Sequence, residues 1–189
     1  MSRGMSRALG PTCAAMLSLA ACARAPGPRG PVALVRAEVE QAEAAEKARR
    51  HDIARTHYQR AIELAGDADS IAFARHEYAE TLVTWGDAPE ARAQLELAVA
   101  AQPGDPGAWH DLGVVRHNTG DDPGAIRALA RAEQLAPDDV RPRTALAALY
   151  WKLGDRASAA REYRDMLALD LPDRLRAKVE WALAALAKP

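Results

Sequence analysis

Three Gly-Asp pairs in this chain are spaced 34 residues apart. The copies are Gly86-Asp87, Gly120-Asp121 and Gly154-Asp155. Glycine tolerates the left-handed backbone that often follows the last residue of a helix. Aspartate can accept hydrogen bonds from the free N–H groups that open the next helix. Each pair therefore predicts a tight turn between two helices.

A second kind of break separates one repeat from the next. Gln102–Pro106 and Ala136–Asp139 are rich in proline and aspartate, and neither segment can continue a helix. Pro89 and Pro123 follow the Gly-Asp turns at positions near a helix start, where the missing N–H does no harm. Alanine, the best helix former, fills 44 of the 189 positions. Helix, turn, helix and turn at one fixed period predict an all-α solenoid.

The individual positions of the repeat point to a known family. In the repeat that starts at Pro106, the pattern residues are Trp109, Leu112, Gly113, Ala125, Leu129, Ala132 and Pro137. The repeats that start at Ala72 and Val140 carry matching residues, which include Tyr78, Leu82, Gly86, Leu146, Tyr150 and Gly154. With these residues the chain resembles the tetratricopeptide repeat (TPR) family. The resemblance implies a right-handed α-solenoid of about four helix pairs over residues 35–171, with a C-terminal capping helix at 172–189.

The two ends of the repeat array depart from the pattern. The first pair, from about Val35, lacks a glycine turn at Arg49–Asp52. In the last segment Leu175, Val179, Ala182 and Leu186 form one apolar helix face, as expected of a cap. We expect core positions for Tyr58, Trp109 and Tyr163, and packing at repeat ends for Trp85 and Trp181.

The N-terminus has the layout of a secretory signal. Residues 1–21 combine Arg3 and Arg7 with a short apolar run, and a Pro/Gly-rich linker follows at 22–34. Leu19–Cys22 resembles the lipobox of bacterial lipoproteins, which implies cleavage before Cys22 and acylation of its sulfur. An ordinary signal peptide cut near Ala21 is the alternative. Because alanine follows the cysteine, the resemblance implies the cell envelope, at the outer membrane facing the periplasm.

Repeats of this family present a concave groove that is lined by the first helix of each pair. The expected groove residues are Phe73, His76, Glu80, Val83, His110, Val114, His117, Asn118, Thr144, Ala148, Trp151 and Lys152. Trp151 is the expected aromatic anchor for a partner, because large aromatic side chains bury much area at interfaces. The alternative is that Trp151 packs under the C-terminal helix.

Three of the five histidines fall on this groove, which raises the question of a metal site. His110 and His117 are two helical turns apart, about 10 Å along the axis, and cannot share one zinc ion. His76 and His110 could converge near Glu80, which would suit a metal-dependent enzyme. Ordinary polar lining of the groove is the favoured interpretation, so no metal, no other cofactor and no catalytic residue is predicted.

Charge and motifs narrow the possible functions. With 25 Lys and Arg residues against 26 Asp and Glu residues, no basic surface indicates nucleic acid. The Lys, Asn and Arg clamp with which some TPR proteins hold a carboxylate is absent from the matching positions. The sequence therefore predicts a lipid-anchored scaffold that binds a protein or peptide partner of the cell envelope. A more specific alternative, by likeness of layout, is a lipoprotein that assists assembly of a type IV pilus secretin.

Overall fold

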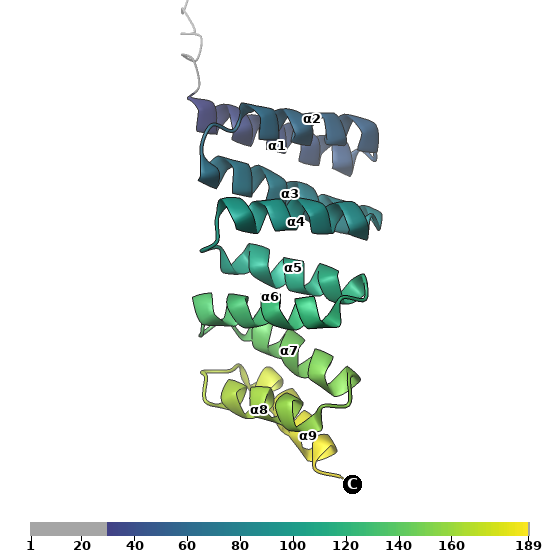
Figure 1. Ribbon diagram of the computed structural model, residues 1–189, viewed down its shortest axis with the longest axis vertical. Coiled ribbons are helices and arrows are strands. Elements are labelled where there is room, and N and C mark those ends of the chain that lie inside the picture. Colours follow the sequence, from purple (N-terminus) through teal and green to yellow (C-terminus); the bar gives the residue numbers. More distant parts are fainter. Residues whose placement is uncertain (1–29, 189) are drawn as a thin grey trace, which may run out of the picture.

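The computed structural model of this chain describes residues 30–188, and in them helices stack along one long axis (Figure 1). The helices in this range are α1 (Pro31–Lys47), α2 (His51–Leu64), α3 (Ala68–Trp85), α4 (Ala88–Ala101), α5 (Pro106–Asn118), α6 (Asp122–Leu135), α7 (Val140–Lys152), α8 (Arg156–Leu167) and α9 (Asp173–Leu186). No strand occurs in the same range. The predicted all-α solenoid of four helix pairs and a cap is confirmed.

The helices form two layers. Each odd helix packs most extensively against the even helix that follows it, and each even helix then contacts the next odd one. Contacts also join α1 to α3 and α5 to α7, so the odd helices from α1 to α7 lie side by side along the stack (Figure 1). One face of the solenoid therefore consists of the odd helices, as the repeat pattern predicts.

The Gly-Asp turns have the backbone geometry that the sequence predicts. Gly86, Gly120 and Gly154 have φ angles of 82°, 83° and 80°, in the left-handed region. At the central turn the Asp121 N–H bonds back to the Arg116 carbonyl at 2.8 Å, which closes the end of α5. The Asp121 carboxylate then accepts the Gly124 N–H at 2.9 Å and caps α6.

The first helix pair makes the same turn without a glycine. Arg49 has a φ of 58°, and it is the one non-glycine residue with positive φ in residues 30–188. Its N–H bonds to the Glu46 carbonyl at 2.7 Å, and the Arg50 N–H bonds to the Ala45 carbonyl at 2.9 Å. The turn of the repeat is therefore present although its glycine is absent. The left-handed conformation of Arg49 costs free energy, because arginine has a Cβ atom.

Small residues allow the helices of a pair to approach closely. Alanines at the α–α contacts, such as Ala61, Ala91 and Ala125, are fully buried. At Gly113 even a Cβ atom would lie 2.6 Å from the Leu129 side chain, so glycine is required there. Larger side chains fill the space between pairs, where buried Tyr58 and Tyr78 stack with their ring centroids 5.0 Å apart.

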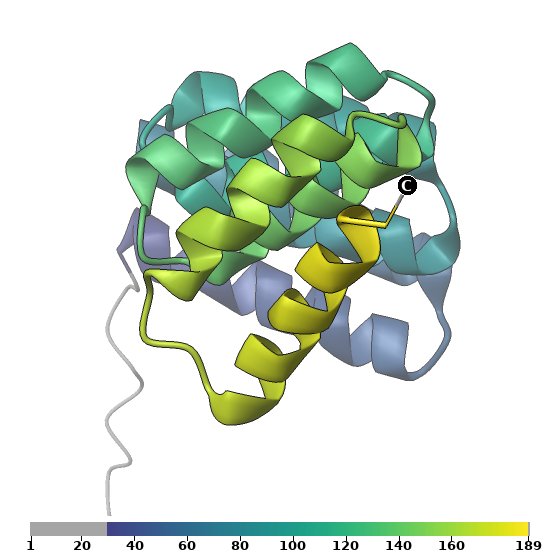
Figure 2. The same ribbon diagram turned by 90° about the horizontal axis from the view of Figure 1, so that it is seen from below.

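The C-terminal helix lies beside α8 at the end of the stack (Figure 2). Its Val179, Ala182 and Leu186 are buried and Leu175 is partly buried, which is the face expected of the cap. The expectation that Trp181 packs at a repeat end is wrong, because its side chain is 70% exposed. Trp181 lies on the outer face of α9, away from the buried residues Val179, Ala182 and Leu186.

The N-terminal predictions concern residues that are mostly outside the described range. The signal peptide at 1–21 and Cys22 lie outside residues 30–188, and the structure says nothing of them. Helix α1 begins at Pro31, within the segment predicted as a linker up to residue 34. Proline can occupy the first turn of a helix because the N–H that it lacks has no helical partner there. None of the helices within residues 30–188 has the length and hydropathy needed to cross a membrane.

Candidate functional site

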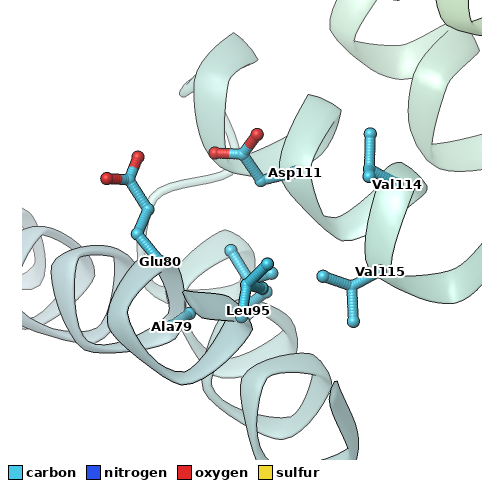
Figure 3. A pocket seen from close by; sticks show the side chains of 7 residues that line it. Ala79, Glu80, Leu95, Asp111, Val114 and Val115 are labelled. Atoms are coloured by element: carbon cyan, nitrogen blue, oxygen red, sulfur yellow. The ribbon is translucent and has the colours of Figure 1, made fainter. Parts of the chain in front are cut away.

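The odd-helix face carries a pocket between α3 and α5. It has a volume of about 240 Å³ and is lined by Ala79, Glu80, Val83, Leu95, Asp111, Val114 and Val115. Figure 3 shows the carboxylates of Glu80 and Asp111 on one side of this pocket and Val114 and Val115 on the other. Val83 is 44% exposed, which leaves an apolar surface open to a partner. We call this the α3–α5 pocket.

A second pocket continues the first between α5 and α7. It has a volume of about 220 Å³ and is lined by Gly113, Val114, His117, Leu129, Ala145, Ala148, Leu149 and Lys152. Val114 lines both pockets, so the two form one continuous apolar track across three odd helices. The predicted groove residues Glu80, Val83, Val114, His117, Ala148 and Lys152 all line this track. We call it the central groove.

Carboxylates dominate the next pocket, towards the N-terminus. It lies between α1 and α3, and four of its lining residues are glutamates, Glu43, Glu46, Glu77 and Glu80. The basic residue among its lining is Lys47, which forms an ion pair with Glu43 at 3.5 Å. Burial raises the pKa of Glu77, and the neighbouring charge of Glu80 raises it further. This acidic end of the groove is therefore suited to a positively charged partner.

Asp111 joins two of the predicted groove histidines. Its Oδ2 lies 2.7 Å from His76 Nε2, and its Oδ1 lies 2.9 Å from His110 Nδ1. Although burial opposes this, the hydrogen bonds from His110 and His76 hold the pKa of Asp111 well below its usual range. The hydrogen bond to Asp111 in turn raises the pKa of His76. The groove wall at the α3–α5 pocket is thus a fixed His-Asp-His network.

The predicted convergence of His76, His110 and Glu80 is corrected by this network. His76 and Glu80 do come together, at 3.7 Å between Nε2 and Oε1, but the third member is Asp111. His110 contacts the far oxygen of Asp111 instead. Asp111 was missed because repeat positions placed residues 110, 114 and 117 on the groove. Asp111, the next residue on α5, also reaches α3. The signal for this contact in the sequence is its spacing of 35 residues from His76, close to the period of the repeat.

His117 links α5 to the N-terminal turn of α6 and to α7. Its Nδ1 hydrogen-bonds to the Asp122 carboxylate, and its Nε2 lies 3.1 Å from Lys152 Nζ. Lys152 therefore marks the basic end of the central groove.

The other predicted groove residues lie around its edges. The Arg36 guanidinium lies 4.9 Å from the centre of the Phe73 ring, which places Phe73 against α1. Asn118, the last residue of α5, is exposed. The exposed Thr144 bonds its hydroxyl to the Val140 carbonyl of its own helix at 2.7 Å. None of these three lines the central groove as defined above.

Trp151 lies at the repeat position that His117 occupies 34 residues earlier. His117 contacts the next odd helix, whereas Trp151 meets α8: its ring is edge-on to Tyr163, with centroids 6.4 Å apart. Trp151 is half-buried, and Tyr163 packs against buried residues of the last helices. Part of the Trp151 ring therefore packs at the C-terminal end of the solenoid, and its role as a partner anchor stays a prediction.

Comparison with known proteins supports the fold. Among solved structures, the chain is similar to MamA (16% identity, TM-score 0.69, covering 81% of this chain and 80% of MamA). It is also similar to PilF of Pseudomonas aeruginosa (18%, 0.66, covering 84% and 69%). A third is YrrB, a TPR protein with an unusual peptide-binding site (19%, 0.63, covering 79% and 74%). These likenesses establish a TPR-like fold.

At the level of sequence the likeness is shorter. A 74-residue stretch is 34% identical to the human PEX5-related protein, which covers 39% of this chain. The chain spans only 12% of the length of that relative. No known family model matches the chain.

Proposed function

We propose that this chain is a scaffold that binds a segment of a partner protein in the central groove. The observation that carries the proposal is the continuous apolar track of two pockets that meet at Val114. Exposed apolar surface of this kind is more typical of an interaction site than of a free protein surface. The TPR-like fold supports the same function, because its odd helices hold the track on a rigid framework.

The charges of the groove favour a particular partner segment. Glu43, Glu46 and Glu77 lie at its N-terminal end, and the valines and Ala148 lie beyond them. A segment with Lys or Arg at one end and small apolar side chains at the other would match both regions. Electrostatic complementarity of this kind raises the association rate and fixes the direction in which the partner lies.

Lipid anchorage at Cys22 completes the proposal. The Leu19–Cys22 motif supports it, and two or three acyl chains would hold the protein stably at a membrane. Anchorage in the cell envelope would raise the effective concentration of the groove for membrane partners. Labelling with radioactive palmitate in a bacterial host tests this. Incorporation that is lost in Cys22→Ser supports the anchor, and equal labelling of the variant contradicts it.

Assembly of a type IV pilus secretin is the more specific alternative. Its support is the likeness of layout in the sequence together with the similarity in fold to PilF of Pseudomonas aeruginosa. Because the two sequences are only 18% identical, this similarity supports a common fold and not a common partner. In this alternative the partner segment belongs to a secretin subunit.

Capture of partners from detergent-solubilised membranes tests the groove. The intact chain is compared with Val83→Glu, which places a charge in the α3–α5 pocket, and with Leu97→Glu on α4. These two residues are matched controls, because they are 44% and 48% exposed. A partner that is lost with Val83→Glu and kept with Leu97→Glu supports the groove, and a secretin subunit among such partners supports the pilus alternative. Partners that bind both variants alike contradict the proposal.

A further inference from the structure

Three side chains on the groove wall bring one nitrogen and two carboxylate oxygens together. His76 Nε2 lies 2.7 Å from Asp111 Oδ2 and 3.7 Å from Glu80 Oε1. All three ligand atoms lie within 4.8 Å of one another. His76 and Glu80 are one helical turn apart on α3, and Asp111 reaches them from α5. We infer that this cluster is a binding site for a divalent transition metal ion, with Zn²⁺ as the best match.

The spacing of the ligand atoms suits the ion. Zinc bonds of about 2.0–2.2 Å in a tetrahedral site place neighbouring ligand atoms roughly 3.3–3.6 Å apart. The observed 2.7 Å and 3.7 Å lie on either side of this range. An increase of about 0.6 Å in the first distance and a decrease of about 0.1 Å in the second bring both into this range. The metal ion then takes the place of the proton that joins His76 to Asp111.

Two further side chains lie next to the ligands. The second oxygen of Asp111 accepts a hydrogen bond from His110 at 2.9 Å, which orients the carboxylate. The other ring nitrogen of His76, Nδ1, lies 3.9 Å from Asp105 Oδ2. Metal-bound histidines usually pair their second nitrogen with a carboxylate or carbonyl group, and Asp105, although 3.9 Å is too long for a hydrogen bond, is a carboxylate on that side of the ring. His110 is therefore assigned to the support of the site rather than to the metal itself.

The site opens into the α3–α5 pocket, which tells what the metal could do. Glu80 and Asp111 line that pocket together with Val83 and Val114 (Figure 3). Three protein ligands leave one coordination position of a tetrahedral ion free. A water molecule, or a histidine or carboxylate of the partner segment, can fill it. A mixed set of imidazole and carboxylate ligands without sulfur is compatible with Zn²⁺ and also with Co²⁺.

Titration of the purified full-length chain with Zn²⁺, followed by calorimetry, tests this inference. The expected result is one ion per chain, with binding weakened at least tenfold in His76→Ala and in Asp111→Asn. Glu80→Gln is a second test that does not threaten the fold, because the Glu80 side chain is 60% exposed. It is expected to weaken binding as well, and His110→Ala by about tenfold through loss of support.

His57→Ala is the matched control. His57 Nδ1 lies 2.7 Å from Glu38 Oε2, a histidine–carboxylate pair like the one in the site, but it belongs to no three-ligand cluster in residues 30–188. This variant is expected to bind Zn²⁺ as the wild type does. Co²⁺ adds a spectroscopic test, since its visible absorption bands report the ligand geometry directly. Absence of stoichiometric binding, or equal binding by His76→Ala and the wild type, overturns the inference and leaves an ordinary ion-pair network.

Discussion

The left-handed turn residue is the structural feature whose energetic cost can be worked out most directly. A residue with a Cβ atom in this conformation costs roughly 1–2 kcal/mol relative to glycine. Glycine loses more chain entropy on folding than alanine does, and this reduces its advantage by about 0.4–1 kcal/mol. The balance favours glycine by about 1 kcal/mol. At Gly120 no atom lies within 4 Å of an added Cβ, so no steric clash is added to this balance.

Comparison of glycine with alanine at two positions tests this balance. Gly120→Ala is expected to lower the free energy of unfolding by about 1 kcal/mol, which corresponds to roughly 2–4 °C in Tm for a chain of this size. At Arg49, which has a φ of 58°, the same order is expected: Arg49→Gly should be more stable than Arg49→Ala by the same amount. The comparison of Gly with Ala at both positions removes the effect of the arginine charge.

Thermal and urea unfolding followed by circular dichroism measure these differences. Gly86→Ala and Gly154→Ala are further controls, since both glycines have the same φ and open space around an added Cβ. The reasoning is refuted if alanine equals glycine at position 120. It is also refuted if Arg49→Ala proves as stable as Arg49→Gly, since the turn would then impose no backbone strain.

Three shorter predictions concern side chains near the C-terminal end. Burial of Glu162 and the nearby charge of Glu133 raise the pKa of Glu162, so its charge destabilises the fold above the unfolded pKa. Glu162→Gln is therefore expected to raise Tm at pH 7, and the gain should vanish when melts are repeated below about pH 4. Trp151→Ala is expected to cost about 1–2 kcal/mol in urea unfolding through loss of the Tyr163 contact, and an unchanged stability would favour a purely partner-facing role. Trp181→Ser should leave Tm unchanged, because the ring is exposed; a clear drop in Tm would contradict that placement.

The sequence was sufficient to predict the repeat architecture because its turns depend on local chemistry. A glycine that adopts a left-handed conformation and an aspartate that caps a helix leave a signature at fixed positions. Arg49 shows the limit of that signature: the backbone turn persists because the helices of the first pair still pack, although the glycine is absent.

The site was predicted less completely, for a geometric reason. Repeat positions identify which side of an odd helix faces the groove, and Val83, Val114 and Lys152 were found in this way. They do not show which side chains meet across two helices, since a shift of one residue turns a side chain by about 100° around the helix axis. Because of that shift, Asp111 was missed and His110 was expected in its place beside His76 and Glu80. The exposure of Trp181 depends on which face of α9 packs against α8, and the repeat pattern does not specify this.

Selection of a displayed peptide library on the purified chain tests the central claim most directly. Peptides that are enriched are then measured for affinity to the wild type, Val83→Glu and Leu97→Glu. We predict that enriched peptides combine small apolar side chains with Lys or Arg. Their Kd should rise at least tenfold with Val83→Glu and stay unchanged with Leu97→Glu. Failure to enrich any peptide, or equal affinity for Val83→Glu and the wild type, would contradict the assignment of the central groove as the binding surface.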